Sequence, residues 1–191
     1  IGAGASITAV KNGKSFDTSM GFTPVAGITM ATRSGDVDPS LIAFMQGKLN
    51  LSSDEMIDIL NHKSGLLGIS GISPDMRDIL AAAEKGDDRA QLALDIYVNR
   101  IVRYIGAYIA EMGGADAIVF TAGVGENSVP VRKMITDKLD YFGIKIDPEK
   151  NDCHGVERDL SADDAKIKTL LIPTNEELMI VRDIERLKKN N

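Results

Sequence analysis

The chain has 191 residues, which is the length of one full domain or of part of a larger enzyme. Its 28 acidic residues outnumber its 22 lysines and arginines, so the formal net charge is −6. That balance argues against a nucleic-acid surface and against binding to an anionic membrane, and no apolar run approaches the roughly 20 residues that span a bilayer.

The first predicted element is a β-hairpin over residues 6–19. Apolar residues precede Asn12 and Gly13, a strong signal for a two-residue turn, and a second short strand follows them. Residues 20–39 are rich in glycine, threonine and proline and lack helical periodicity. They predict a long irregular segment, the kind of loop in which functional residues concentrate.

Helices are expected next, at residues 40–49 and 53–63, each preceded by residues that favour an N-cap. Residues 64–75 are rich in glycine and serine and predict a loop. The longest helix is predicted to run from Asp87 or Asp88 to Met112, because apolar residues recur at three- and four-residue steps until Gly113.

The last part of the chain alternates strands and helices. We expect a strand at 117–120, a helix at 129–142, a strand at 169–172 and a final helix at 175–188. This order predicts an α/β fold in which helices flank a mixed sheet. The final helix carries more apolar surface than one face needs. That favours contact with a partner chain; packing on the sheet of its own chain is the alternative.

The most informative segment is residues 118–128, where a β-branched run stops at Gly123 and Gly125 before a helix. Glycine lets backbone N–H groups approach a ligand, and a helix N-terminus adds partial positive charge, so this turn suits a phosphate. The alternative is that the glycines only allow a tight turn between the strand and the helix. The segment matches neither the dinucleotide fingerprint nor the P-loop.

Arg33 lies in a non-helical loop that contains Gly35, where its guanidinium could clamp a phosphate or a carboxylate with two hydrogen bonds. The simpler alternative is a salt bridge from Arg33 to Asp36 or Asp38. Residues 2–4, Gly-Ala-Gly, form a second glycine turn before the hairpin. Two such turns in two strand units could hold the two ends of one polyphosphate.

Two further segments contain acidic residues at the start of predicted helices. Glu176 follows the strand at 169–172, and a carboxylate beyond the carboxyl end of a strand can hold Mg²⁺ directly or through water. The alternative is that Thr174 or Asn175 caps the final helix and that Glu176 and Glu177 are favourable in its first turn. The metal role and this structural role can both be true. Asp75 precedes another helix and has the same alternative role as an N-cap.

Cysteine and histidine usage adds little to the functional prediction. The single cysteine, Cys153, excludes an internal disulfide and fits a reducing cytoplasm. Its neighbour His154 has too few potential partners for a metal site, since the other histidine is His62. We therefore interpret this pair as loop residues. Taken together, the glycine turns, Arg33 and the acidic strand end narrow the function to nucleotide-dependent phosphoryl transfer.

The chain resembles the acetate kinase family. The matching segments are residues 20–24 running on to 32–36, residues 120–128 and residues 172–178, in the family's order and spacing. The resemblance covers the whole chain, which looks like the C-terminal half of such an enzyme. The start at Ile1, without a methionine, fits a fragment whose N-terminal domain is absent, so we expect residues 1–191 to be a C-terminal nucleotide-binding and dimerisation domain.

The resemblance implies an actin-like ATPase (ribonuclease H-like) fold and a cytoplasmic homodimer. It implies reversible transfer of a phosphoryl group from ATP to acetate, giving acetyl phosphate and ADP, with Mg²⁺ or Mn²⁺. The fragment alone is expected to be inactive. By similarity, Arg33 stabilises the transition state and Glu176 binds the metal. The residues expected to bind the nucleotide by the same similarity are Gly2, Ala3, Gly4, Asp75, Met76, Arg77, Gly123, Val124, Gly125, Glu126 and Asn127.

Two positions depart from the family pattern. The family usually has His-Leu-Gly-Asn-Gly where this chain begins Ile1-Gly2-Ala3-Gly4, so Ala3 lacks the donor of an asparagine beside the phosphates. Met76 stands where an aromatic residue is common, although a thioether can still pack on a purine edge. Three hypotheses remain open: an acetate kinase half, a kinase for propionate or another short-chain carboxylate, and a non-catalytic nucleotide-sensing or dimerisation domain.

Overall fold

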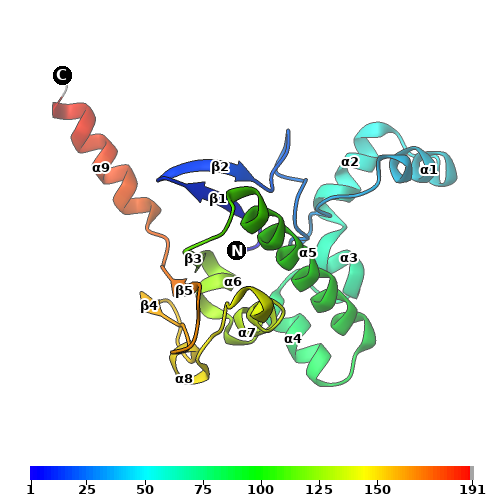
Figure 1. Cartoon of the computed structure of the whole chain (residues 1–191). Helices are drawn as coiled ribbons and strands as arrows, with labels where there is room; N and C mark the ends of the chain where they lie inside the picture. The colour runs from blue at the N-terminus through cyan, green and yellow to red at the C-terminus, as the bar shows by residue number, and fades with distance from the viewer. Residues whose placement is uncertain (190–191) are drawn as a thin grey trace.

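The computed structural model describes residues 1–189 and shows a layered α/β body from which one helix projects (Figure 1). The expected domain thus includes two residues, 190 and 191, that lie outside the described part. The elements are, in chain order, β1 (Thr8–Lys11), β2 (Lys14–Thr18), α1 (Pro39–Leu49), α2 (Ser53–His62), α3 (Gly65–Ser70), α4 (Met76–Glu84), α5 (Asp88–Met112), β3 (Ala117–Phe120), α6 (Ala122–Asn127), α7 (Val129–Asp137), a 3-10 turn (Asp140–Phe142), α8 (Pro148–Asn151), β4 (Arg158–Asp159), β5 (Lys168–Leu171) and α9 (Glu176–Lys189).

The predicted hairpin is confirmed, and so is its turn. Strands β1 and β2 pair antiparallel and are joined by Asn12 (φ 54°) and Gly13 (φ 73°). Two consecutive residues with positive φ define the turn type whose twist matches that of the flanking strands. The hairpin forms a two-stranded sheet of its own and does not join the main sheet.

The main sheet is mixed, as predicted, with the strand order β3-β5-β4. Strand β5 pairs parallel with β3 and antiparallel with the short β4. The sequence placed β5 one residue too late and did not predict β4 or α8. Both parallel strands end at the same edge of the sheet, so the segments that follow them, α6 and residues 172–175, are neighbours.

Helix α5 organises the core. Its sequence-predicted range is confirmed: Asp87 caps its N-terminus by accepting from Ala90 N, and Gly113 ends it with φ 75°. The apolar stripe of α5 is buried, with Ile101 fully so, and the helix packs against α3, α4 and α7. A single long helix therefore supports the elements on both sides of the region where the functional side chains gather.

Residues 64–75 were predicted to be a loop, which is wrong, because α3 (Gly65–Ser70) lies within them. The first-turn N–H groups of this helix donate to carbonyls of the irregular segment: Leu66 N to Met30 O (2.9 Å) and Leu67 N to Ala31 O (3.0 Å). Gly65 has φ 59°, and a Cβ there would lie 2.3 Å from Met30 O. Tertiary contacts with a distant segment thus form a helix from a locally weak sequence.

Two further predictions need correction near the main sheet. The predicted glycine turn after β3 is itself a short helix, α6, and the residue with positive φ in that turn is Ala122 (φ 61°). The helix predicted over 129–142 ends at Asp137, and only a 3-10 turn follows it at Asp140–Phe142. The structure therefore has one additional short helix after β3 and a shorter helix following it.

Helix α9 extends away from the body of the molecule (Figure 1), and none of its described residues is buried. The alternative that it packs on the sheet of its own chain is therefore wrong. Its side chains Leu178, Ile180 and Ile184 are exposed. Across residues 1–189, no helix combines the length and the apolar character needed to cross a membrane.

Candidate functional site

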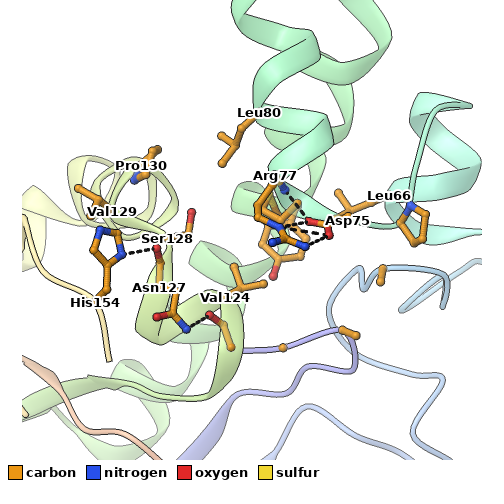
Figure 2. A pocket seen from close by; sticks show the side chains of 17 residues that line it. Leu66, Asp75, Arg77, Leu80, Val124, Asn127, Ser128, Val129, Pro130 and His154 are labelled. Atoms are coloured by element: carbon orange, nitrogen blue, oxygen red, sulfur yellow. Dashed lines mark hydrogen bonds and ion pairs between the residues drawn. The ribbon is translucent and has the colours of Figure 1, made fainter. Parts of the chain in front are cut away.

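A pocket of about 670 Å³ lies between α4, α5 and the α6–α7 junction, with the N-terminal segment at one side (Figure 2). That volume is typical of a site for a small organic ligand. It brings together three segments that are far apart in sequence, each containing residues expected to bind a nucleotide. The residues lining it are Gly2, Ala3, Ala31, Leu66, Pro74, Asp75, Met76, Arg77, Leu80, Tyr97, Gly123, Val124, Asn127, Ser128, Val129, Pro130 and His154.

The end of the pocket near Gly2 has fewer free N–H groups than the sequence suggested. In the first turn of α6, Ala122 N donates to Glu126 Oε1 (2.7 Å), while Val124 N and Gly125 N both donate to Ile1 O (2.8 and 3.0 Å). Gly123 N has no acceptor among residues 1–189, and a Cβ on Gly123 would meet open space. The predicted cradle of glycine-turn amides therefore reduces to one available N–H in α6.

Arg33 does not itself line the pocket; it lies beside Gly4, two residues after the pocket-lining Gly2. A Cβ added to Gly4 would be 3.2 Å from Arg33 Nη1, so this glycine allows the guanidinium to approach the N-terminal segment. The alternative prediction, a salt bridge from Arg33 to Asp36 or Asp38, is wrong, because no such ion pair forms within residues 1–189. Asp36 instead accepts from Tyr104 Oη (2.6 Å) and lies 3.8 Å from Arg100 Nη1, and Asp38 caps α1.

Because these neighbouring carboxylates have other partners, the Arg33 guanidinium is not neutralised by them. Its described polar contact is a weak one, from Nη1 to Met30 Sδ at 3.9 Å. Burial, together with the hydrogen bond to Asp36, raises the pKa of Tyr104 to about 12, so the hydroxyl stays protonated as a donor at neutral pH. A positive charge without a carboxylate partner beside a pocket is the arrangement that an anionic ligand requires.

Asp75 and Arg77 form the opposite wall. Asp75 caps α4 by accepting from Arg77 N (2.9 Å), which confirms the N-cap alternative, and its carboxylate also pairs with the Arg77 guanidinium. That side-chain hydrogen bond, with the backbone one, lowers the pKa of Asp75 to about 2. The carboxylate is therefore ionised at neutral pH, and the Asp75–Arg77 pair forms a polar rim over Met76 and Leu80, which also line the pocket.

Glu126 does not line the pocket, because its carboxylate connects two parts of the sheet edge. Its Oε1 accepts from Ala122 N (2.7 Å) and from Thr174 N (2.9 Å) and Oγ1 (3.1 Å). Gly125 also faces away: a Cβ there would pack on Phe120 of β3 at 3.6 Å. Glu126 thus holds α6 and residues 172–175 together, Gly125 packs α6 on β3, and neither lines the cavity.

Glu176 begins α9 two residues after Thr174, and Asn175 Oδ1 accepts from Leu178 N (3.0 Å) as the predicted cap. No cluster of acidic, histidine or cysteine side chains in the described residues could hold a metal ion by itself. The exposed Glu176 carboxylate does not line the pocket; as a single carboxylate it could serve as one ligand of Mg²⁺ only with phosphate oxygens and waters as the others.

Several residues that line the pocket were not among those expected to bind a nucleotide, including Tyr97, Ser128 and His154. His154 was interpreted as a loop residue, Ser128 ended the segment 120–128 without an assigned role, and Tyr97 belonged to the long predicted helix. Each reaches the pocket only because distant segments pack together. No local sequence signal could have identified them.

Arg132 was also missed, and it holds the pocket wall from behind. Its fully buried guanidinium donates to Gly125 O and Glu126 O of α6, to Asn151 Oδ1 and O, and to Cys153 O, at 2.7–2.9 Å. Burial lowers the pKa of this guanidinium. All five N–H donors are used, so one side chain fixes α6 and the loop that follows α8 relative to each other.

The Tyr97 hydroxyl is buried without a hydrogen-bond partner among the described residues, and burial raises its pKa. An unpaired buried hydroxyl costs about 1–3 kcal/mol. We therefore expect Tyr97→Phe to leave the free energy of unfolding unchanged or to raise it by up to about 1–2 kcal/mol. Urea denaturation of both proteins measures this difference. A loss above about 1 kcal/mol would show that the hydroxyl has a partner in solution.

The mixed sheet flanked by helices, with glycine-rich segments and the N-terminus of α6 gathered at one pocket, places the chain among the actin-like ATPase folds. Residues 1–182 match the family model described as the acetokinase family, and the chain belongs to that family. It spans about half the length of the curated relatives it matches.

Three comparisons illustrate the relationship. The chain is 74% identical to the acetate kinase of Limosilactobacillus fermentum over 99% of its own length and 48% of that relative's. It superposes on the crystal structure of Porphyromonas gingivalis acetate kinase with a TM-score of 0.92, at 45% identity, covering 96% of this chain and 46% of the other. A propionate kinase from Francisella tularensis gives a TM-score of 0.88 at 44% identity, covering 94% and 46%.

Proposed function

We propose that a full-length protein carrying this chain transfers a phosphoryl group reversibly between ATP and acetate, giving ADP and acetyl phosphate. The observation that carries the proposal is the pocket, which joins Gly2, Asp75 and Gly123 in one cavity with Arg33 beside its Gly2 end. The names of the relatives support the same reaction. Residues 1–191 would then be the C-terminal nucleotide-binding half.

The residues present suit this chemistry. Phosphoryl transfer needs the reactants in line and the charge on the equatorial oxygens stabilised, and no protein nucleophile is required because acetate itself attacks. In this proposal Arg33 supplies the charge stabilisation, the Gly123 N–H contacts a phosphate oxygen, and the wall of Met76, Leu80 and Val124 packs on the nucleoside. A bound Mg²⁺ would neutralise phosphate charge, with Glu176 as a protein ligand.

The test is formation of acetyl hydroxamate from acetate, ATP and hydroxylamine by the full-length protein. Product at a rate well above that of a heat-denatured control supports the proposal. Product with propionate but not with acetate would select the second candidate function, a propionate kinase. This candidate is motivated by the structural similarity to the Francisella tularensis propionate kinase. No product with either acid would favour the non-catalytic alternative, in which Ala3 leaves the site without a needed donor.

Glu176 is proposed to act on the metal and not on folding. In a full-length enzyme, Glu176→Ala should raise the Mg²⁺ concentration needed for half-maximal rate and lower kcat. The melting temperature should move little, because a first-turn glutamate contributes only about 0.3–1 kcal/mol through the helix dipole. The rate is measured as a function of Mg²⁺ concentration in each variant.

Glu177→Ala is the matched control, since the next residue of α9 points in a different direction. Equal losses in both variants, with unchanged Mg²⁺ dependence, would assign the two glutamates to the helix start alone.

We also propose that the chain forms a homodimer, as the family resemblance implied. The support is the exposed apolar side chains of α9, none of which is buried by a described segment of its own chain. Light scattering over micromolar concentrations should give a dimer mass. A monomer mass throughout that range would rule out the homodimer, and the exposed apolar side chains of α9 would then need another partner.

A further inference from the structure

His154 lies on the pocket wall formed by the end of α6 and the start of α7, close to Ser128 and Val129 and opposite Arg77 and Leu80 (Figure 2). Along this wall His154 lies past Asn127, on the side away from Val124. His154 is therefore beside the last residue of α6, whereas the Gly123 N–H that is proposed to contact a phosphate belongs to the first turn of that helix.

The backbone that carries His154 is fixed on both sides. Before it, Cys153 O accepts from Arg132 Nη2 (2.8 Å), and after it, Gly155 N donates to Glu126 O (3.2 Å). Arg132 is fully buried and Gly155 has φ 58°. The position of this residue is thus determined by a buried network.

The ring orientation is determined as well. His154 Nδ1 is 2.9 Å from Asn127 O, and a carbonyl oxygen only accepts, so Nδ1 carries the hydrogen. In the neutral ring Nε2 is then an acceptor, and it has no partner among the described residues. The exposed ring, held by one nitrogen, thus leaves the other nitrogen free to accept from a ligand in the pocket that His154 lines.

We propose that His154 is a nucleoside-contacting residue, whose Nε2 accepts a hydrogen bond from a donor on the bound nucleotide. This inference rests on the proposed function and adds to it a residue that discriminates between ligands. The chemistry required of the ligand is an N–H or O–H donor beyond the phosphates. A nucleotide has two such sources, an exocyclic amino group on the base and a ribose hydroxyl.

The experiment is calorimetric binding of ADP, IDP and 2′-deoxy-ADP to the full-length protein and its variants. IDP lacks the amino donor, and 2′-deoxy-ADP lacks a ribose donor. We expect His154→Ala to raise the Kd of ADP about 3- to 12-fold, as the loss of one hydrogen bond does, with kcat changed less than about twofold. His154→Gln, whose amide oxygen can accept in place of Nε2, should recover at least half of this loss.

The analogues identify the donor. In the wild-type protein one analogue should bind more weakly than ADP, and in His154→Ala that difference should disappear. His62→Ala is the matched control, since His62 is the other histidine, is exposed on α2 and pairs with Asp58 away from the pocket. It should bind all ligands as the wild type does.

Two results would overturn the inference, and they are distinguishable. Wild-type protein that binds ADP, with an unchanged Kd in His154→Ala, removes the contact and leaves the proposed function intact. Wild-type protein that binds none of the nucleotides removes both. A folding defect is separated by thermal melting, and His154→Gln then provides the decisive comparison.

Discussion

Replacing Arg33 with alanine in a full-length enzyme is expected to lower kcat by about 10²–10³, because the change removes charge stabilisation made mainly in the transition state. The guanidinium stands beside Gly4 without a described carboxylate partner, so its charge is available to a ligand. The KM for nucleotide should change less than kcat. Steady-state kinetics on both substrates separates the two effects.

Arg33→Lys should recover only part of the rate, since an ammonium lacks the planar fork that contacts two oxygens. Arg103→Ala, at an exposed position of α5, is the matched surface control. If kcat of Arg33→Ala is unchanged and only the melting temperature falls, Arg33 has a structural role.

Arg132→Met should be the most damaging single change to stability. It removes a side chain that satisfies five buried or partly buried acceptors, and each stranded acceptor costs about 1–3 kcal/mol. Relaxation of the loop recovers part of that, so we expect a loss of about 3–5 kcal/mol in the free energy of unfolding. Urea denaturation with linear extrapolation measures it.

Arg158→Met provides the control, because Arg158 is exposed and makes one long contact, to Lys150 O at 3.4 Å. Its loss should stay below about 0.5 kcal/mol. A similarly small loss in Arg132→Met would mean that water replaces the guanidinium at all its acceptors.

Much of the fold could be predicted because the relevant signals are local. The turn at Asn12 and Gly13, the periodic stripe of α5 and its end at Gly113 each lie within one stretch of chain. Helix α3 could not, since its first turn depends on carbonyls of residues 30–31, which are about 35 positions earlier. The sequence predicts the elements that local residues specify and misses those that depend on distant contacts.

The same division applies to the candidate site. Glycine turns, Asp75 and Arg33 were visible as local patterns, and the structure gathers most of them at one pocket. The sequence could not show that Ile1 O occupies two of the α6 amides, nor that His154 reaches the pocket. Both follow from the packing of α6 against the N-terminal segment and of the 151–155 loop against α7.

The left-handed backbone of Ala122, at the junction of β3 and α6, narrows the residues that this position tolerates. A Cβ is already unfavourable there, and a β-branched side chain would add a further clash, whereas glycine or asparagine would relieve the conformation. In saturation mutagenesis, the substitutions tolerated at position 122 should therefore be limited by backbone conformation and not by side-chain polarity. The junction of β3 and α6 would then be constrained by its backbone conformation, whatever ligand the neighbouring pocket binds.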